Sequence, residues 1–309
     1  YADNILTINL PKDTILGVVI MFIQQLANGI SVGGIYALIA TGYALIYSLL
    51  GFSNWAHGEV AMIGAYMAIM SILNVKAPLP VAVILGIIVA GIFSFINEKV
   101  AYKRIRDNKA PTMFLMIAAM GLSTTYQNAV TNIFGAKFKI FPGLSAAAFN
   151  IGNITIGWLD LISLIVSLIS LVVLDITINH TKVGLGIRLV ASNSYTASLM
   201  GINVDKYISL VFVVAGMYAG CAGILLGMKY TVYPTMGNVA LKAFISSVLG
   251  GLGSIRGAIV GALIIGIMET MVTAYLSSGL RDLFTFMLLI IILLVKPSGL
   301  MGVHVEDKA

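Results

Sequence analysis

Long apolar stretches separated by short polar ones run through the whole chain. A helix needs about 20 apolar residues to cross the hydrocarbon core of a bilayer. Nine apolar segments stand out and predict eight or nine crossings: 16–47, 60–73, 81–96, 112–134, 159–178, 207–228, 239–249, 258–276 and 283–295. The pattern predicts an all-α, polytopic helical bundle in a membrane, formed as one domain over residues 1–309.

Two regions leave the number of crossings open. Segment 16–47 is interrupted by Gln24, Gln25, Asn28 and Gly33–Gly34, so we expect a short entry helix followed by a full span. Segment 239–249 is short for a span. Glycines also recur four residues apart, which predicts close helix packing in lipid; these pairs are Gly216/Gly220, Gly223/Gly227 and Gly257/Gly261.

The composition agrees with a membrane protein, since 59% of the residues are hydrophobic and only 10% are charged. Soluble domains carry about 25% charged residues. The net charge of +6 is explained by basic loops and gives no indication of nucleic-acid binding. Loop 98–109 is the most basic, so we expect it on the cytoplasmic side, together with segment 181–206 and the tail after Lys296.

Segment 181–206 is polar although long apolar runs flank it on both sides. It reads TKVGLGIRLVASNSYTASLMGINVDK, with Lys182 and Arg188 early and a cap-like Ser192–Asn193 in the middle. Gly201 follows a stretch of small residues and is suited to ending a helix. The segment predicts a short helix outside the lipid that docks on another protein.

A second polar group stands where segment 60–73 begins. Ser53 or Asn54 can cap the helix that follows, and Glu59 lies in its first turns, where the helix dipole favours an anion. Asn54, His57 and Glu59 therefore mark a helix start, or a polar site at the inner end of a transport pathway. A proton relay between His57 and Glu59 is a weaker alternative.

Glu269 lies within the apolar segment 258–276. A charge at the bilayer centre costs about 2.5–3.5 kcal/mol on insertion scales. We therefore expect Glu269 to face the bundle interior, either protonated or bonded to a polar residue such as Gln127 or Asn128. These two amides and Asn28 suit either a polar solute or helix–helix hydrogen bonds.

Nothing in the sequence indicates catalysis or a bound cofactor. The single Cys221 excludes an intrachain disulfide, and the three histidines are too scattered for a zinc site. The glycine-rich run 250–257 lacks the Lys-Ser/Thr ending of a phosphate loop, so it is expected to form a turn, with Arg256 at the cytoplasmic face. We expect no ATP site and no metal in this chain.

Four blocks of sequence carry a resemblance to a known family. They are the runs NGISVGGIYALIATGYALIYSLLGFSNWAHGEVAMIGAY at 28–66, EKVAYKRIR at 98–106, GIRLVASNSYTASLMGINVDKYISLVF at 186–212, and KAFISSVLGGLGSIRGAIVGALIIGIMET at 242–270, which continues to KPSGLMG at 296–302. In this order they resemble the LivH-type permease subunits of branched-chain amino-acid ABC transporters.

The resemblance implies that segment 181–206 is a coupling helix that fits a cleft on a cytoplasmic ATPase. The residues it assigns to this contact are Arg188, Ala191, Ser192, Asn193, Ala197, Gly201, Ile202 and Asn203. The family often has an acidic residue after the first alanine, where this chain has Ser192–Asn193, so the electrostatic part of docking is expected to differ.

The resemblance also implies the partners and the task of the chain. It would form half of a translocation path in a prokaryotic inner membrane, beside a second permease subunit that is LivM-like or a copy of itself. Two ATP-binding subunits would hydrolyse ATP and Mg²⁺ would be bound there, while an extracytoplasmic solute-binding protein would deliver leucine, isoleucine or valine. Urea, short amides or other amino acids are alternative solutes. An ion-coupled secondary transporter and a passive small-solute channel are the rival classes.

Overall fold

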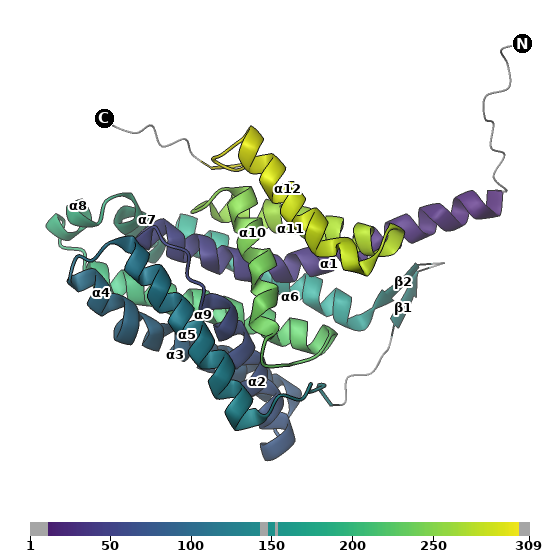
Figure 1. The fold of residues 1–309 in the computed structure, drawn as a ribbon, viewed down its shortest axis with the longest axis horizontal. Helices are drawn as coiled ribbons and strands as arrows, with labels where there is room; N and C mark the ends of the chain where they lie inside the picture. Colours follow the sequence, from purple (N-terminus) through teal and green to yellow (C-terminus); the bar gives the residue numbers. More distant parts are fainter. Residues whose placement is uncertain (1–11, 143–147, 152–153, 303–309) are drawn as a thin grey trace, which may run out of the picture.

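The chain folds into a helical bundle with one short β-hairpin. A computed structural model describes residues 12–142, 148–151 and 154–302 (Figure 1). Its elements are α1 (Lys12–Leu50), α2 (His57–Val75), α3 (Leu79–Asn97), the π-helical turn η1 (Glu98–Tyr102), α4 (Lys103–Asp107), α5 (Thr112–Phe134), β1 (Ala148–Ile151), β2 (Ile154–Gly157), α6 (Trp158–His180), α7 (Lys182–Ser192), α8 (Ser194–Leu199), α9 (Val204–Lys229), the 3₁₀ turn η2 (Met236–Val239), α10 (Ala240–Gly250), α11 (Ile255–Tyr275), the 3₁₀ turn η3 (Ser278–Leu280) and α12 (Arg281–Val295). The expected all-α membrane bundle is confirmed.

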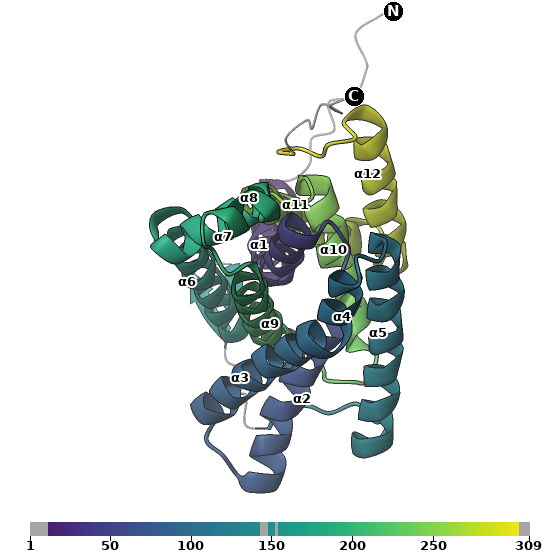
Figure 2. The same cartoon turned by 90° about the vertical axis from the view of Figure 1, so that its left-hand side faces the viewer.

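Helix α1 forms the axis around which the other helices pack. It has 39 residues and is therefore about 58 Å long. Figure 2 looks nearly along it and shows α6, α7 and α9 on one side, α10 and α11 close against it, and α5 and α12 at the outer edge. Its second half is buried almost without a break, as Ile35, Leu38, Ile39 and Ala44 show.

The expected break in segment 16–47 does not occur, since α1 is continuous. The glycines that suggested a break serve packing instead, while Gln25 and Asn28 line a cavity. A Cβ on Gly33 would lie 2.9 Å from the Cα of Leu263 in α11, and one on Gly34 would lie 3.1 Å from Ser167 in α6. The glycines therefore let two neighbouring helices approach the backbone of α1 while its own hydrogen bonds stay intact.

Seven helices in the described part of the chain are long and apolar enough to cross a membrane. Helix α5 has 23 residues but is too polar to belong to this group, and η2 with α10 forms a shorter apolar unit, Met236–Gly250. The sequence indicated eight or nine crossings, whereas seven helices of the described residues have the length and hydropathy of a span.

Helix α5 carries hydroxyl and amide groups on its exposed face. Thr124, Thr125 and Asn128 are exposed, yet each donates a hydrogen bond to the carbonyl four residues earlier, over 3.1, 2.7 and 2.8 Å. These donors are thus paired within the helix itself, which lowers the cost of exposing them to apolar surroundings.

Glycine contacts hold the helices close together, as the four-residue spacing predicted. Gly220 of α9 lies against Gly64 of α2: a Cβ added to Gly64 would lie 2.7 Å from the Cα of Gly220. Gly261 of α11 lies against the carbonyl of Ser246 in α10. Because lipid supplies no hydrophobic force between helices, close van der Waals packing of this kind stabilises the bundle.

The two ends of the bundle differ in structure. We call one the α8 end: it brings together α8, α4, the last turn of α1 and the start of α11, with Leu45, Tyr102, Ala197 and Ile255 in one cluster (Figure 1). We call the other the hairpin end, which holds β1 and β2, the end of α9 and η3. The strands pair antiparallel, with Ala148 opposite Gly157 and Ile151 opposite Ile154.

The basic segment 98–109, expected to be a loop, is helical over most of its length. Helix α3 continues through η1 into α4. Arg106 pairs with the buried Glu98 at 3.2 Å and with Asp205 of α9 at 2.6 Å, and Lys103 pairs with Asp205 at 2.7 Å. Part of the basic charge therefore fastens the start of α9 to this helix, which a count of charges in sequence could not reveal.

The glycine-rich run 250–257 forms the turn between α10 and α11, as expected. Gly251 and Gly253 have φ of +112° and +85°, a region that favours glycine. The C-terminal segment packs on this turn, because Leu300 and Met301 donate backbone hydrogen bonds to Leu249 and Gly250 over 2.9 and 2.8 Å. Arg256 is exposed and lies 3.6 Å from Asp175 of α6.

Replacing Gly266 with valine tests the α1–α11 contact. An added Cβ there would lie 2.4 Å from the Gly33 nitrogen, so the helices must separate. Overpacking of this kind costs about 1–3 kcal/mol. We expect a lower thermal unfolding temperature in detergent and less monodisperse protein. Gly17→Val is the control, because no atom lies within 4 Å of a Cβ at Gly17; equal losses in both variants would contradict the assignment.

Candidate functional site

A cavity of about 670 Å³ opens at the hairpin end of the bundle. It lies between α1, the first turn of α6, the end of α9 with the segment after it, η2, α10, α11 and the start of α12. Its lining residues are Gln25, Asn28, Val32, Tyr36, Asp160, Leu226, Lys229, Tyr230, Thr231, Tyr233, Met236, Asn238, Val239, Lys242, Glu269, Thr270, Thr273, Ala274, Arg281 and Asp282. Three of these side chains carry a positive charge and three a negative charge.

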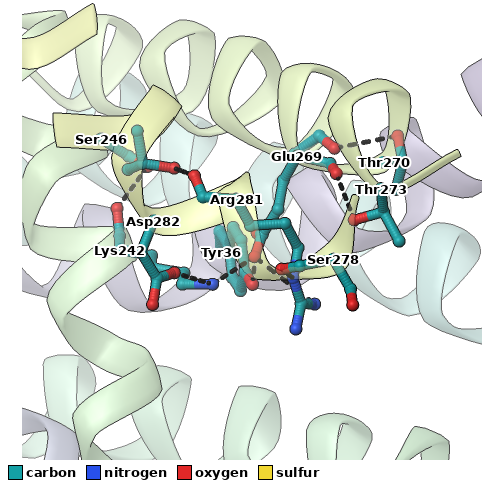
Figure 3. A network of polar contacts seen from close by, with 11 residues as sticks. Tyr36, Lys242, Ser246, Glu269, Thr270, Thr273, Ser278, Arg281 and Asp282 are labelled. Atoms are coloured by element: carbon teal, nitrogen blue, oxygen red, sulfur yellow. Dashed lines mark hydrogen bonds and ion pairs between the residues drawn. The ribbon is translucent and has the colours of Figure 1, made fainter. Parts of the chain in front are cut away.

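Glu269 is the buried centre of a network on one wall of this cavity (Figure 3). One of its carboxylate oxygens accepts a hydrogen bond from the Tyr36 hydroxyl at 2.8 Å. The other oxygen pairs with Lys242 and lies 3.7 Å from a guanidinium nitrogen of Arg281. Lys242 in turn lies 3.0 Å from Asp282. The network therefore joins α1, α10, α11 and α12.

The partners of Glu269 differ from those expected. Neither Gln127 nor Asn128 forms a hydrogen bond with it. Lys242 and Arg281 supply the positive charge that offsets the cost of burying the Glu269 carboxylate. Taking one partner away from a buried ion pair leaves an uncompensated charge and costs about 3–5 kcal/mol. Lys242 is therefore a main link between the short helix α10 and the rest of the bundle.

A second ion pair lines the same cavity from α6 and α9. Asp160 pairs with Lys229, and the hydroxyl of Ser31 in α1 donates to the same carboxylate oxygen at 3.1 Å. Asp160 lies in the first turn of α6, where a carboxylate is commonly solvated. It is instead partly buried and paired, so it fixes the start of α6 against α1 and α9.

Glu59 belongs to a separate cluster between α2 and α5. One of its oxygens accepts hydrogen bonds from Gln127 at 2.7 Å and from Ser123 at 3.2 Å. A Cβ on Gly237 would lie 2.4 Å from the other oxygen, so the carboxylate presses directly against η2. Glu59 and Gln127 thus meet, and together they position α5 and η2 on α2.

Asn54 and His57 point to other neighbours. Asn54 accepts a hydrogen bond from Tyr102 at 2.7 Å and one from the amide of Ala56, the residue that precedes α2. His57 is fully buried, with its ring 4.8 Å from that of Tyr43. No hydrogen bond joins His57 to Glu59 among the described residues, so the three sequence candidates do not form a single site.

The structure therefore sorts the candidates into distinct places. Asn28 and Glu269 line the cavity at the hairpin end, whereas Asn128 is exposed on α5 and bonds only to its own helix. Sequence reasoning missed Lys229, Lys242 and Arg281. Each of them is a positively charged residue close to the end of an apolar segment. Such residues are easily missed when only isolated acidic residues within a span are taken as candidates.

The polar segment 181–206 forms two short helices at the α8 end. Asn193 separates them and caps α8, since its side chain accepts the amide of Thr196 at 2.9 Å. Asn203 caps α9 in the same way, accepting the amide of Lys206 at 3.0 Å. One short helix was expected; the segment forms two because Asn193, which looked cap-like in the sequence, ends α7 and caps α8.

The end of α8 is a glycine stop of the Schellman type. Ile202 donates its amide to Ala197 over 3.1 Å, and Gly201 donates to Ser198 over 3.0 Å. Gly201 has φ of +81°, which disfavours any residue with a Cβ other than Asn or Asp. The turn therefore fixes the orientation of α8 on the surface of the bundle.

The two faces of α8 differ in exposure. Ala197 is buried among Ile187, Val190 and Ile208, so its side chain holds α8 to the bundle. Tyr195, Leu199 and Met200 are 71%, 71% and 68% exposed. Arg188, Ser192 and Asn193 are also exposed, while Ala191 and Ile202 are half-buried. The exposed apolar residues of α8 are suited to a protein contact.

The arrangement is that of a membrane transport subunit. A multi-pass bundle carries a charged cavity at one end and a short exposed helix at the other. No group of three or more His, Cys, Asp or Glu side chains that could hold a metal was found in residues 12–142, 148–151 and 154–302.

Comparison with known proteins defines the family. A family model described as branched-chain amino acid transport system / permease component matches residues 25–293. The chain is 38% identical over 296 residues to the high-affinity branched-chain amino acid transport system permease protein LivH of Salmonella typhimurium, covering 91% of this chain and 96% of the relative. The BraD permease protein of Pseudomonas aeruginosa is 36% identical over the same shares. The chain therefore belongs to the branched-chain amino-acid transport permease family.

A solved structure shares the fold. PsaBC from Streptococcus pneumoniae in complex with a Fab superposes with a TM-score of 0.51 over 91% of this chain and 97% of that chain, at 12% sequence identity. At this identity the likeness concerns the fold alone.

A double-mutant cycle tests the Lys242–Glu269 pair. Lys242→Met leaves the carboxylate without its closest cation, so we expect a loss of about 3–5 kcal/mol. Adding Glu269→Gln should restore much of that loss, because no buried charge then remains unpaired. Thermal unfolding of the single and double variants in one detergent is the measurement; additive losses would show that the two residues act independently.

Proposed function

We propose that the chain is the permease subunit of an ATP-driven importer of branched-chain amino acids, and that it lines half of the translocation path. The single observation that carries the mechanism is α8, which presents exposed Tyr195, Leu199 and Met200 at the end opposite the charged cavity. A subunit of this kind has one end to receive a solute and another to receive mechanical force.

We propose that the α8 end is cytoplasmic and docks on an ATPase subunit. Lys103, Arg104, Arg106, Lys109 and Arg188 gather at this end, in agreement with the excess of basic residues on the cytoplasmic side of membrane proteins. The contact is mainly steric, because Ser192 and Asn193 carry no charge. Closure of the ATPases would push α8, and Ala197 would pass this movement to α7 and α9.

The remaining partners follow from the same proposal. A second permease subunit, either LivM-like or another copy of this chain, completes the path, and two ATPase subunits hold ATP and Mg²⁺. A solute-binding protein delivers the amino acid at the hairpin end, which is extracytoplasmic. Leucine, isoleucine and valine are the proposed solutes in a prokaryotic inner membrane, with urea, short amides and other amino acids as alternatives.

Uptake measurements in the source organism test this function. Deleting the gene should abolish saturable uptake of radiolabelled leucine, and a plasmid copy should restore it. Unlabelled isoleucine and valine should compete, whereas urea and acetamide should not. Uptake that survives ATP depletion would indicate a passive channel, and uptake lost on collapsing the proton gradient at constant ATP would indicate a secondary transporter.

Leu199→Asp tests the docking face of α8. A charge placed in an apolar contact should weaken co-purification of the ATPase subunits and reduce ATP-driven uptake at least tenfold, the effect of about 1.4 kcal/mol. Leu276→Asp is the matched control, since Leu276 is also well exposed but lies next to the hairpin end. Unchanged co-purification and uptake in Leu199→Asp would refute docking through this face.

Two substitutions of Gly201 separate backbone conformation from side-chain size. No atom lies within 4 Å of a Cβ at this position, so only the φ of +81° restricts the residue. Gly201→Val should disturb the turn and lower uptake relative to ATP hydrolysis, whereas Gly201→Asn, which tolerates this conformation, should stay close to wild type. Transport and hydrolysis assayed together in proteoliposomes give the ratio; equal ratios in the two variants would contradict the role of the turn.

A further inference from the structure

We propose that the cavity at the hairpin end is itself a binding site for a zwitterionic, aliphatic α-amino acid. Arg281 would take the carboxylate, Glu269 would take the ammonium group, and an apolar wall would hold the side chain. The inference rests on the function proposed above and deepens it, because it assigns part of the substrate recognition to the permease rather than to its binding protein alone.

The first argument is the loose contact between Glu269 and Arg281. At 3.7 Å it is the longest ion pair in the described part of the chain, and no hydrogen bond joins the two groups. The neighbouring contacts of Glu269, with Tyr36 and Lys242, are close. Since no hydrogen bond holds Arg281 to Glu269, the guanidinium group can turn away to receive a ligand, and a zwitterion then offers each of the two groups the opposite charge.

The second argument is the spare hydrogen-bonding capacity of Arg281. A guanidinium group has five N–H donors in a planar fork that suits a carboxylate. In the described structure only the Nε of Arg281 donates a hydrogen bond, to the carbonyl of Ser278 at 3.2 Å. The side chain is 41% exposed and lines the cavity, so the remaining donors are open to a ligand (Figure 3).

The third argument is that the charged side chains lining the cavity are held in place before a ligand binds. Lys242 is held between Glu269 and Asp282, and Asp160 is paired with Lys229 across the cavity. The six charges sum to zero, so the cavity favours neither an anion nor a cation. A neutral ligand with two separated charges matches this field better than an ion of either sign.

The fourth argument is the apolar part of the wall. Val32, Leu226, Met236 and Val239 line the same cavity as the charges. The first three are almost fully buried, so they form a fixed surface against which a branched aliphatic side chain can pack. The volume of about 670 Å³ lies within the range of about 300–1,000 Å³ found for small-molecule sites.

Ligand-observed NMR on the full chain in lipid nanodiscs tests the proposal without the binding protein. Saturation-transfer spectra of leucine, of leucinamide and of 4-methylpentanoate compare the zwitterion with analogues that lack the carboxylate or the ammonium group. We expect leucine to bind with a dissociation constant about tenfold lower than either analogue, because each analogue leaves one charged partner unmatched.

Variants then assign the groups. Arg281→Met should weaken leucine binding about tenfold and remove the preference for leucine over leucinamide, since the carboxylate has lost its partner. Glu269→Gln should remove the preference over 4-methylpentanoate. Arg256→Met is the matched control: this arginine also forms a long ion pair, at 3.6 Å, but lies at the α8 end. It should leave all three affinities unchanged.

The outcomes separate this inference from the proposed function. Equal binding of leucine and leucinamide to the unmodified chain, or an unchanged preference in Arg281→Met, would overturn the cavity as a zwitterion site even if ATP-driven uptake of leucine is intact. Loss of the preference in Arg281→Met, with Arg256→Met unaffected, would support it. Absence of ATP-dependent leucine uptake in the whole system would instead refute the proposed function.

Discussion

The contact between the backbones of α1 and α11 is the constraint on which the rest of the structure depends. Gly33 and Gly266 face each other there without side chains between them. Tyr36 lies three residues after Gly33, and Glu269 lies three residues after Gly266. Residues three apart occupy the same face of a helix. The two helices run antiparallel, so Tyr36 and Glu269 lie on opposite sides of the glycine contact along the helix axes. Side chains of a helix lean toward its N-terminus, so these two lean toward each other and form a hydrogen bond of 2.8 Å.

The short helix α10 connects the two ends of the bundle through this arrangement. Lys242 near its start belongs to the charged network, while Gly250 at its end accepts a hydrogen bond from the C-terminal segment. Its 11 residues are too few to reach across a bilayer, and η2 adds only 4 more. A rigid element fixed at one end by charges and at the other by backbone hydrogen bonds is suited to transmit displacement between the ends.

Sequence reasoning succeeded where the information is local and failed where it is distant. The apolar segments, the stop at Gly201 and the cap at Asn193 depend on neighbours within a few residues, and they are found where expected. The cap expected from Ser53 or Asn54 is not formed, because α2 begins after Ala56 without a side-chain cap. The continuity of α1 and the partner of Glu269 depend on helices far away in sequence. The glycines of α1 resembled a break because the helix that fills the space beside them lies about 230 residues later.

The polar face of α5 has a consequence for how the chain enters the membrane. Thr124, Thr125 and Asn128 each donate to a carbonyl of the same helix, which lowers the cost of placing these groups in lipid. Helix α5 is nevertheless less apolar than α3 and α6, which precede and follow it. Stable insertion of α5 during synthesis therefore depends on its neighbours: α2 supplies Glu59 for Gln127 and Ser123, and biogenesis of this segment is a cooperative step rather than an independent one.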